Sequence, residues 1–123
     1  MKAKDIIQYE VSNQDTILLI VNKSVCRVFE TSAYWLSKHI PMDKLYNKYS
    51  RSLDTRMIYA WFSVRRLNKV LDELHAKGFH PVARKEGYIV LKKEGAKPDD
   101  YDEWRERVYD GVMVNQVYIM EEA

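Results

Sequence analysis

The sequence predicts an α/β (α+β) domain built on a single mixed sheet of about five to six strands flanked by helices. Short β-branched and aromatic runs alternate along the chain with segments of helical periodicity. Glycine, proline or turn-forming residues mark most of the boundaries between them. With 123 residues, of which 46% are hydrophobic, the chain has the size of one domain over residues 1–123 with one core.

The first clear elements are two strands. The run Thr16–Val21, rich in β-branched residues and leucine, is typical of a strand buried on both faces. Turn-forming residues at Asn22-Lys23-Ser24 connect it to a second run, Val25–Phe29, so the pair predicts a hairpin. Residues 3–11 precede these strands, and their pattern fits either a short helix or an edge strand.

Two helices are predicted next. Thr31 or Ser32 can cap a helix over Ala33–His39, and Pro41 prevents this helix from simply continuing. A further short helix is predicted over Lys44–Arg51, with basic side chains along one of its faces.

The unit with the clearest sequence signals follows an exposed loop predicted at residues 50–56. It spans residues 57–93 and reads as strand, helix, strand, turn, strand. Ser63 is a natural N-cap, because its hydroxyl can accept a hydrogen bond from an amide of the first helical turn. Gly78 follows the last turn, where a left-handed residue ends a helix at little cost. The apolar stripe of the helix consists of Val64, Leu67, Val70, Leu71 and Leu74.

The C-terminal part predicts a linker, a helix and a strand. The linker is residues 95–98, and the helix covers residues 99–109, with two aspartates at its positively polarised N-terminus. Gly111 ends the helix, and Val112–Met120 is the final predicted strand.

Composition restricts the class of protein. No apolar run approaches the roughly 20 residues that span a bilayer. The N-terminal segment lacks the apolar core and cleavage site of a signal peptide. Cys26 is the only cysteine, so no internal disulfide is expected. We therefore expect a soluble, cytoplasmic protein with no membrane partner.

No residue pattern points to catalysis or to a bound metal. Cys26 lies within a predicted strand, where cysteine is usually a small buried hydrophobe. The histidines His39, His75 and His80 show no metal-ligand spacing, and the glycines form no phosphate-binding loop. The acidic run at residues 99–106 is expected to be solvated. The sequence thus predicts no catalytic residue, no metal and no cofactor.

The net charge of +2 is unevenly distributed. Residues 44–93 contain twelve basic and four acidic residues, whereas residues 94–123 contain nine acidic and three basic ones. A basic middle segment can attract nucleic acid. The acidic C-terminal segment could equally fold across that middle segment and neutralise it, and the sequence leaves both possibilities open.

Basic and aromatic residues alternate most closely in Lys44–Arg51, as a surface that binds phosphates and stacks bases would require. The alternative is an amphipathic helix with its tyrosines in the core and its lysines in water. Trp35, Trp61 and Trp104 are expected to be core or interface anchors rather than base-stacking residues.

Two stretches resemble the N-terminal, mismatch-recognising domain of the MutS family of DNA mismatch-repair proteins. The first is ILLIVNKSVCRVFETSA, which has that domain's apolar strand, hairpin and following helix, with Phe29 and Ala33 at the matching places. The second is VLDELHAKGFHPVA, whose matching residues are Leu71, Leu74, Gly78, Val82 and Ala83. The resemblance covers roughly residues 17–83 and implies a mixed sheet surrounded by helices.

The resemblance also implies a surface that faces DNA. The family inserts a Phe into the duplex and contacts the mismatched base with a Glu two residues later, and these positions hold Val25 and Arg27 here. Lys23 stands where the family has a glycine. Because valine has no aromatic face and arginine reverses the charge, mismatch reading by that mechanism is not expected. The resemblance still implies cations on this surface. They are Lys23 and Arg27 on the hairpin and Arg51 and Arg56 on the following loop.

These observations predict a non-catalytic module that binds DNA or RNA through phosphate contacts, which are sequence-independent and sensitive to salt. The predicted contact residues are Lys23, Arg27, Lys44, Lys48, Arg51 and Arg56. The alternative is a protein–protein interaction module without nucleic-acid affinity. It would act as a homodimer or as an accessory subunit of a mobile-element or nucleic-acid-processing system.

Overall fold

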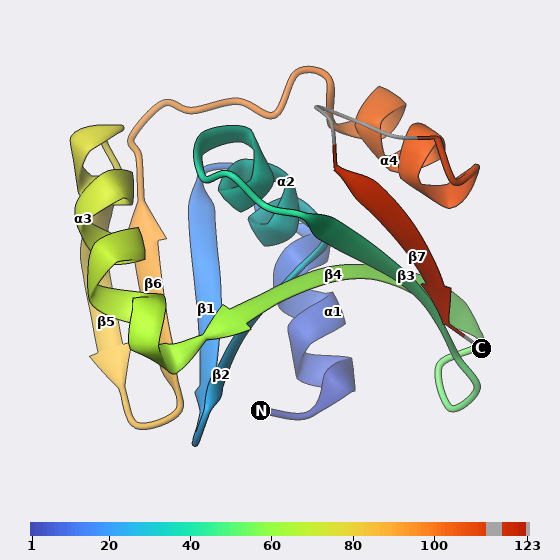
Figure 1. The fold of residues 1–123 in the computed structure, drawn as a ribbon, viewed down its shortest axis with the longest axis horizontal. Coiled ribbons are helices and arrows are strands. Elements are labelled where there is room, and N and C mark those ends of the chain that lie inside the picture. The colour runs from blue at the N-terminus through green and yellow to red at the C-terminus, as the bar shows by residue number, and fades with distance from the viewer. Residues whose placement is uncertain (113–116, 123) are drawn as a thin grey trace.

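A computed structural model describes residues 1–112 and 117–122 of the chain. Within these residues seven strands form one mixed sheet in the order β5-β6-β1-β2-β4-β3-β7, and four helices surround it (Figure 1). The strands are β1 (Thr16–Asn22), β2 (Val25–Phe29), β3 (Lys44–Ser50), β4 (Thr55–Ser63), β5 (His80–Lys85), β6 (Tyr88–Lys92) and β7 (Tyr118–Glu122). The helices are α1 (Ala3–Val11), α2 (Glu30–His39), α3 (Leu67–Ala76) and α4 (Tyr101–Tyr109), with a short 3-10 turn, η1 (Val64–Arg66), before α3. The predicted fold class is confirmed, with slightly more strands than expected.

Pairing between neighbouring strands is mainly antiparallel. β1 pairs with β2 as the predicted hairpin, β2 pairs with β4, and β4 pairs with β3. β7 joins β3 in parallel at one edge, and β5 joins β6 in antiparallel fashion at the other. Residues distant in sequence therefore meet in rows across the sheet, and the side chains of one row share a face.

One face of the sheet holds the core. α2 packs on β1, β2 and β4, α4 packs on β3 and β4, and the apolar stripe of α3 joins the same buried cluster. Cys26 is fully buried in this cluster, as predicted, and burial raises the pKa of its thiol. The strands contribute Ile17, Leu19, Cys26, Val28, Leu45, Ile58, Ala60, Phe62, Ile89 and Leu91 to it. We call this side the core face.

The prediction of a helix over residues 44–51 is wrong, because Lys44–Ser50 forms strand β3. Leu45 and Asn47 are buried, Tyr46 between them is half-buried, and Lys44 and Lys48 on either side are exposed, which is the two-residue alternation of a strand. The segment has backbone partners on both sides, in β4 and β7. A short apolar-polar pattern is ambiguous between helix and strand, and these partners decide the outcome.

The N-terminal segment, which fits either a helix or an edge strand, is helix α1. The caps predicted for α2 are not used: the helix begins at Glu30, and no side chain caps it. The Ser32 hydroxyl instead donates to Glu10 Oε2 at 2.6 Å and accepts from the amide of Leu18 at 2.9 Å. Ser32 therefore bonds to Glu10, a residue distant in sequence, instead of capping the helix as the sequence predicted.

The strand-helix-strand-turn-strand order of the central unit is confirmed, but its first strand begins at Thr55, inside the loop predicted at residues 50–56. The Ser63 side chain accepts a hydrogen bond from the amide of Arg65 at 3.2 Å, although the turn it caps is η1. Gly78 has a φ of 96°, and the amide of Phe79 beyond it returns to Leu74 O at 2.9 Å. Residues 113–116 of the final predicted strand lie outside the described residues. No helix in the described part of the chain is long and apolar enough to cross a membrane.

Candidate nucleic-acid interface

The face opposite the core carries basic and aromatic side chains on four neighbouring strands, and we call it the open face. Among the described helices, α2, α3 and α4 pack on the core face, whereas α1 lies against part of the open face, where its Ile6 and the sheet residue Met57 are both buried. The side chain of Trp61 is 46% exposed here and that of Tyr118 is 64% exposed. The residues of the open face are Arg27 and Phe29 on β2, Met57, Tyr59 and Trp61 on β4, Lys44, Tyr46 and Lys48 on β3, and Tyr118 and Met120 on β7.

Three aromatic rings on the open face form a continuous row. Strand pairing places Phe29 opposite Tyr59, and Tyr59 opposite Tyr46. The ring centroids of Phe29 and Tyr59 are 5.6 Å apart, and those of Tyr59 and Tyr46 are 5.0 Å apart with nearly parallel planes. Cross-strand aromatic pairs of this kind are favourable and fix the orientation of their rings. The row thus presents an ordered apolar surface across β2, β4 and β3.

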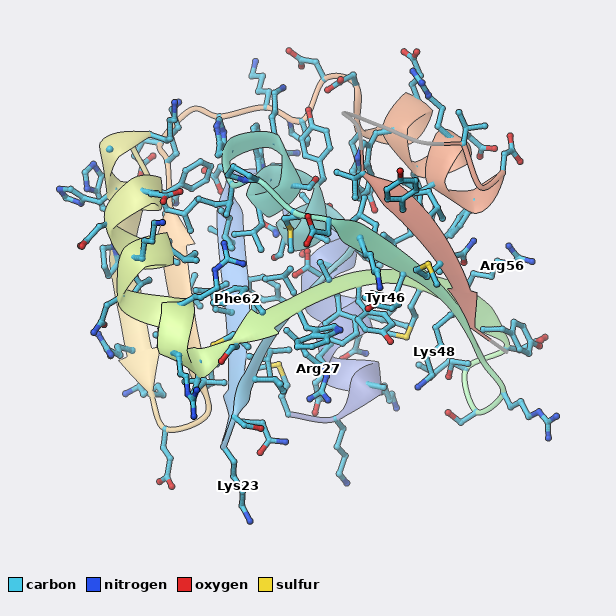
Figure 2. The ribbon with its side chains drawn as sticks, viewed as in Figure 1. Lys23, Arg27, Tyr46, Lys48, Arg56 and Phe62 are labelled. Carbon is cyan, nitrogen blue, oxygen red and sulfur yellow. The ribbon has the colours of Figure 1, made fainter. Side chains whose placement is uncertain are left out.

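Three cations accompany these rings. Strand pairing places Arg27 beside Trp61, Lys44 beside Tyr118, and Lys48 beside Met57. Figure 2 shows Arg27, Tyr46 and Lys48 following one another along this part of the sheet. Among the described side chains, the ion pairs to carboxylates use Lys38, Lys92 and Arg105 and none of the open-face cations. These ion pairs leave the open-face cations without a carboxylate partner among the described side chains, and strand pairing also places Lys48 beside Glu122 of β7.

The structure brings together three of the six predicted contact residues, namely Arg27, Lys44 and Lys48. Lys23 lies in the turn between β1 and β2, and Arg51 lies in the turn between β3 and β4, at opposite ends of the sheet. Arg56 alternates with Met57 on β4 and lines a pocket with Glu30 and Arg105 instead. The six residues therefore do not form one surface, and Arg56 lies apart from the open face.

A hollow of about 320 Å³ lies between α1 and the open face. Phe29, Met57 and Tyr59 line it from the sheet, together with the cations Arg27 and Lys48. Ala3, Ile6 and Ser50 complete its wall. Its volume is at the lower end of the range found for small-molecule sites, and its lining combines an apolar base with two charged groups.

The helix of the acidic C-terminal segment does not cover the open face. Trp104 and Val108 of α4 are buried in the core cluster on the opposite side of the sheet. At the start of this helix, Asp100 accepts a hydrogen bond from the Tyr34 hydroxyl and lies 3.9 Å from Lys38 Nζ. The hydrogen bond from Tyr34 is the main cause that lowers the pKa of Asp100. The carboxylate of Asp100 is thus held beside α2.

A second and larger pocket, of about 530 Å³, contains two acidic side chains with raised pKa values. Glu10 is only 4% exposed, and burial raises its pKa to about 7. Burial also raises the pKa of Glu30, although Arg105 Nη2 lies 3.5 Å from Glu30 Oε1. Raised carboxyl pKa values can serve general acid catalysis.

The protein itself occupies the carboxyl oxygens of both groups. Glu10 accepts hydrogen bonds from the amide of Ser32 at 3.0 Å, from the Ser32 hydroxyl and from Asn13 Nδ2 at 3.0 Å. Glu30 accepts from the amide of Ile58 at 3.4 Å besides its ion pair with Arg105. These contacts join α1 to α2, and α2 to α4 and β4. Among the described residues, no group of three or more His, Cys, Asp or Glu side chains could hold a metal ion.

Sequence reasoning did not separate Trp61 from Trp35 and Trp104, since it described all three as core or interface anchors. Trp35 and Trp104 are buried, as expected of core anchors, whereas Trp61 is exposed on the open face. The signal was present in the alternation of β4: Met57, Tyr59 and Trp61 share one side, and Ile58, Ala60 and Phe62 share the other.

Comparisons with models of known protein families, with curated proteins and with solved structures find no match. The resemblance to the MutS N-terminal domain therefore stays a prediction.

Proposed function

We propose that this protein is a non-catalytic nucleic-acid-binding module that contacts phosphates through Arg27, Lys44 and Lys48 on the open face. The proposal rests on one observation. Three cations without a carboxylate partner among the described side chains share a sheet face with a row of three neighbouring aromatic rings. Nucleic acid offers the complementary chemistry, because it presents phosphates for the cations and base surfaces for the rings.

The phosphate contacts predict a defined dependence on salt. Each cation that neutralises a phosphate releases condensed counterions, so the logarithm of the binding constant falls linearly with the logarithm of the salt concentration. Three such contacts correspond to a slope of about −2 to −3, depending on whether the nucleic acid is single- or double-stranded. The contacts carry no sequence information, so we expect affinity to vary little between sequences of one strand type.

The proposal is tested by fluorescence anisotropy with labelled single-stranded and duplex oligonucleotides at about 50 and about 200 mM salt. The variant Arg27→Gln/Lys44→Gln/Lys48→Gln is expected to lose most of its affinity and most of the salt slope. The matched control Arg66→Gln/Lys69→Gln/Lys77→Gln removes three exposed charges from η1 and the neighbourhood of α3. It is expected to bind like the parent protein. Absence of binding at micromolar protein, or equal losses in both variants, would refute the proposed surface.

A second candidate function is protein–protein interaction, and the edge strand β7 favours it. β7 is the last strand of the sheet, and it exposes Tyr118 and Met120 on the open face. An exposed strand edge can pair with another chain, and aromatic residues are common interface anchors. A salt-sensitive dimer in light scattering, together with no affinity for nucleic acid, would support this function over the first.

A further inference from the structure

We infer that the open face binds single-stranded nucleic acid, with one unstacked base seated in the hollow between α1 and the sheet and phosphates at Arg27 and Lys48. This inference rests on the proposed function and names the class of nucleic acid. It also assigns a binding role to the hollow and to Trp61.

The accessible rings discriminate between single strands and duplexes. In a duplex, successive bases lie about 3.4 Å apart and stack on each other, so their faces are not available to protein side chains. A single strand can splay its bases and stack them on aromatic rings. Trp61 and Tyr118 lie on β4 and β7, which are separated by β3, so they stand about 10 Å apart across the sheet. Bases bound to both rings must therefore be separated from each other, which a duplex does not permit.

The hollow has the chemistry that a nucleotide requires. Phe29 and Tyr59 contribute ring surface, and Met57 adds apolar contact. Arg27 and Lys48 approach from different strands, β2 and β3, so a base in the hollow has cations on more than one side. Both cations can reach the phosphates that flank the base, while the rings contact the base itself.

Trp61 gives the first test a spectroscopic signal. It is exposed, whereas Trp35 and Trp104 are buried, so a base that stacks on Trp61 is expected to quench part of the intrinsic fluorescence. The probe is a thymidine or uridine oligonucleotide of about 12 nucleotides, compared with a duplex of equal length. Trp61→Ala is expected to weaken single-strand binding by about 5- to 150-fold. Trp61→Phe should retain affinity and lose the quench. Tyr49→Ala, which removes an exposed ring from the other side of β3, is the control and should leave binding unchanged.

The second test fills the hollow without removing a charge. Ala3 is exposed at the start of α1 and lines the hollow, so Ala3→Trp places a large side chain in the space assigned to the base. We expect single-strand affinity to fall at least about 5-fold, the lower limit for loss of one stacked base. Gln8→Trp introduces the same residue at an exposed position of α1 that does not line the hollow. It should bind like the parent protein.

The outcomes separate this inference from the proposed function. Equal affinity for single strands and duplexes, with no effect of Trp61→Ala or Ala3→Trp, would overturn the inference and leave a phosphate-binding module. No affinity for either nucleic acid would overturn both. Preferential binding of single strands, with quenching and with losses in both variants but not in their controls, would support both.

Discussion

The two faces of the sheet differ in chemistry although the same strands build them. In β4, Ile58, Ala60 and Phe62 point into the core cluster, whereas Tyr59 and Trp61 between them belong to the open face. An aromatic residue on the core face is enclosed by helices, and the aromatic residue next to it in sequence meets solvent. The comparison teaches that residue type alone does not distinguish a buried core residue from an exposed one in this protein. The side of the strand on which a residue lies distinguishes the two.

The largest expected difference between the faces concerns two neighbouring residues of β4. Phe62→Ala should lower the free energy of unfolding by about 3–5 kcal/mol, because it leaves a cavity in the core. Trp61→Ala, on the open face, should change it by less than about 1 kcal/mol, as exposed substitutions usually do. Urea denaturation of both variants provides the measurement. Similar losses would show that Trp61 is also packed in the native state and would break the comparison.

The next expected effect is a dependence of stability on pH through Glu10. Its pKa is about 7 in the folded protein, which is above its ordinary value of 4.5, so the folded state binds the proton more tightly. The resulting stabilisation is complete below pH 4.5 and is lost as the pH rises through 7. The loss should be on the order of 3 kcal/mol.

Glu10→Gln isolates this contribution, because glutamine has a similar shape and does not titrate. Unfolding of the parent protein and of this variant should be compared at about pH 5 and about pH 8. The parent should be less stable at the higher pH, and the variant should show little of that dependence. A variant with the full pH dependence of the parent would assign the effect to another group, such as Glu30.

A smaller effect is expected from the hydroxyl that anchors α1. Ser32→Ala removes a donor to Glu10 and an acceptor for the amide of Leu18, and both partners are buried. Leaving such groups unsatisfied should destabilise the protein by about 1–3 kcal/mol. Ser12→Ala, at an exposed position after α1, is the control and should be nearly neutral in thermal or urea unfolding. Because α1 forms a wall of the hollow, loosening this anchor should also reduce single-strand affinity.

The smallest expected effect compares two cations on opposite sides of the same strand pair. Lys48→Gln should reduce the salt slope of binding by roughly 0.7–0.9, the contribution of one phosphate contact. Arg56→Gln should leave the slope unchanged, since Arg56 lines the pocket around Glu30 on the other side of β4. A reduction by Arg56→Gln alone would mean that nucleic acid binds on the core-face side, against both proposals.

Much of the fold follows from local pattern. The β1–β2 hairpin, the end of α3 at Gly78 and the helix after the 95–98 linker are predicted because turn residues and apolar periodicity agree at these places. β3 is not predicted, since the seven residues Lys44–Ser50 fit either period and adopt the strand only with β4 and β7 beside them. The position of Glu10 inside a polar cluster is likewise invisible, because Ser32 lies 22 residues away.

The candidate interface, too, is predicted by the sequence only in part. The sequence identifies a basic middle segment, yet the charges of that segment separate in the structure: Lys44 and Lys48 lie on the open face, while Arg66 and Lys69 lie in η1 and α3. Arg27 joins the lysines only because β2 pairs with β4, and β4 with β3. The exposure of Trp61 depends on which side of β4 the helices cover.

The sequence by itself determines where most helices and strands begin and end, that the chain has one core, and that its charge is divided between a basic and an acidic segment. These properties are local, because each depends on neighbouring residues and their spacing. The tertiary structure decides which strands become neighbours, which face of the sheet the helices cover, and which cations and rings meet on the other. Contacts between residues distant in the chain set these features, so no short stretch of sequence encodes them.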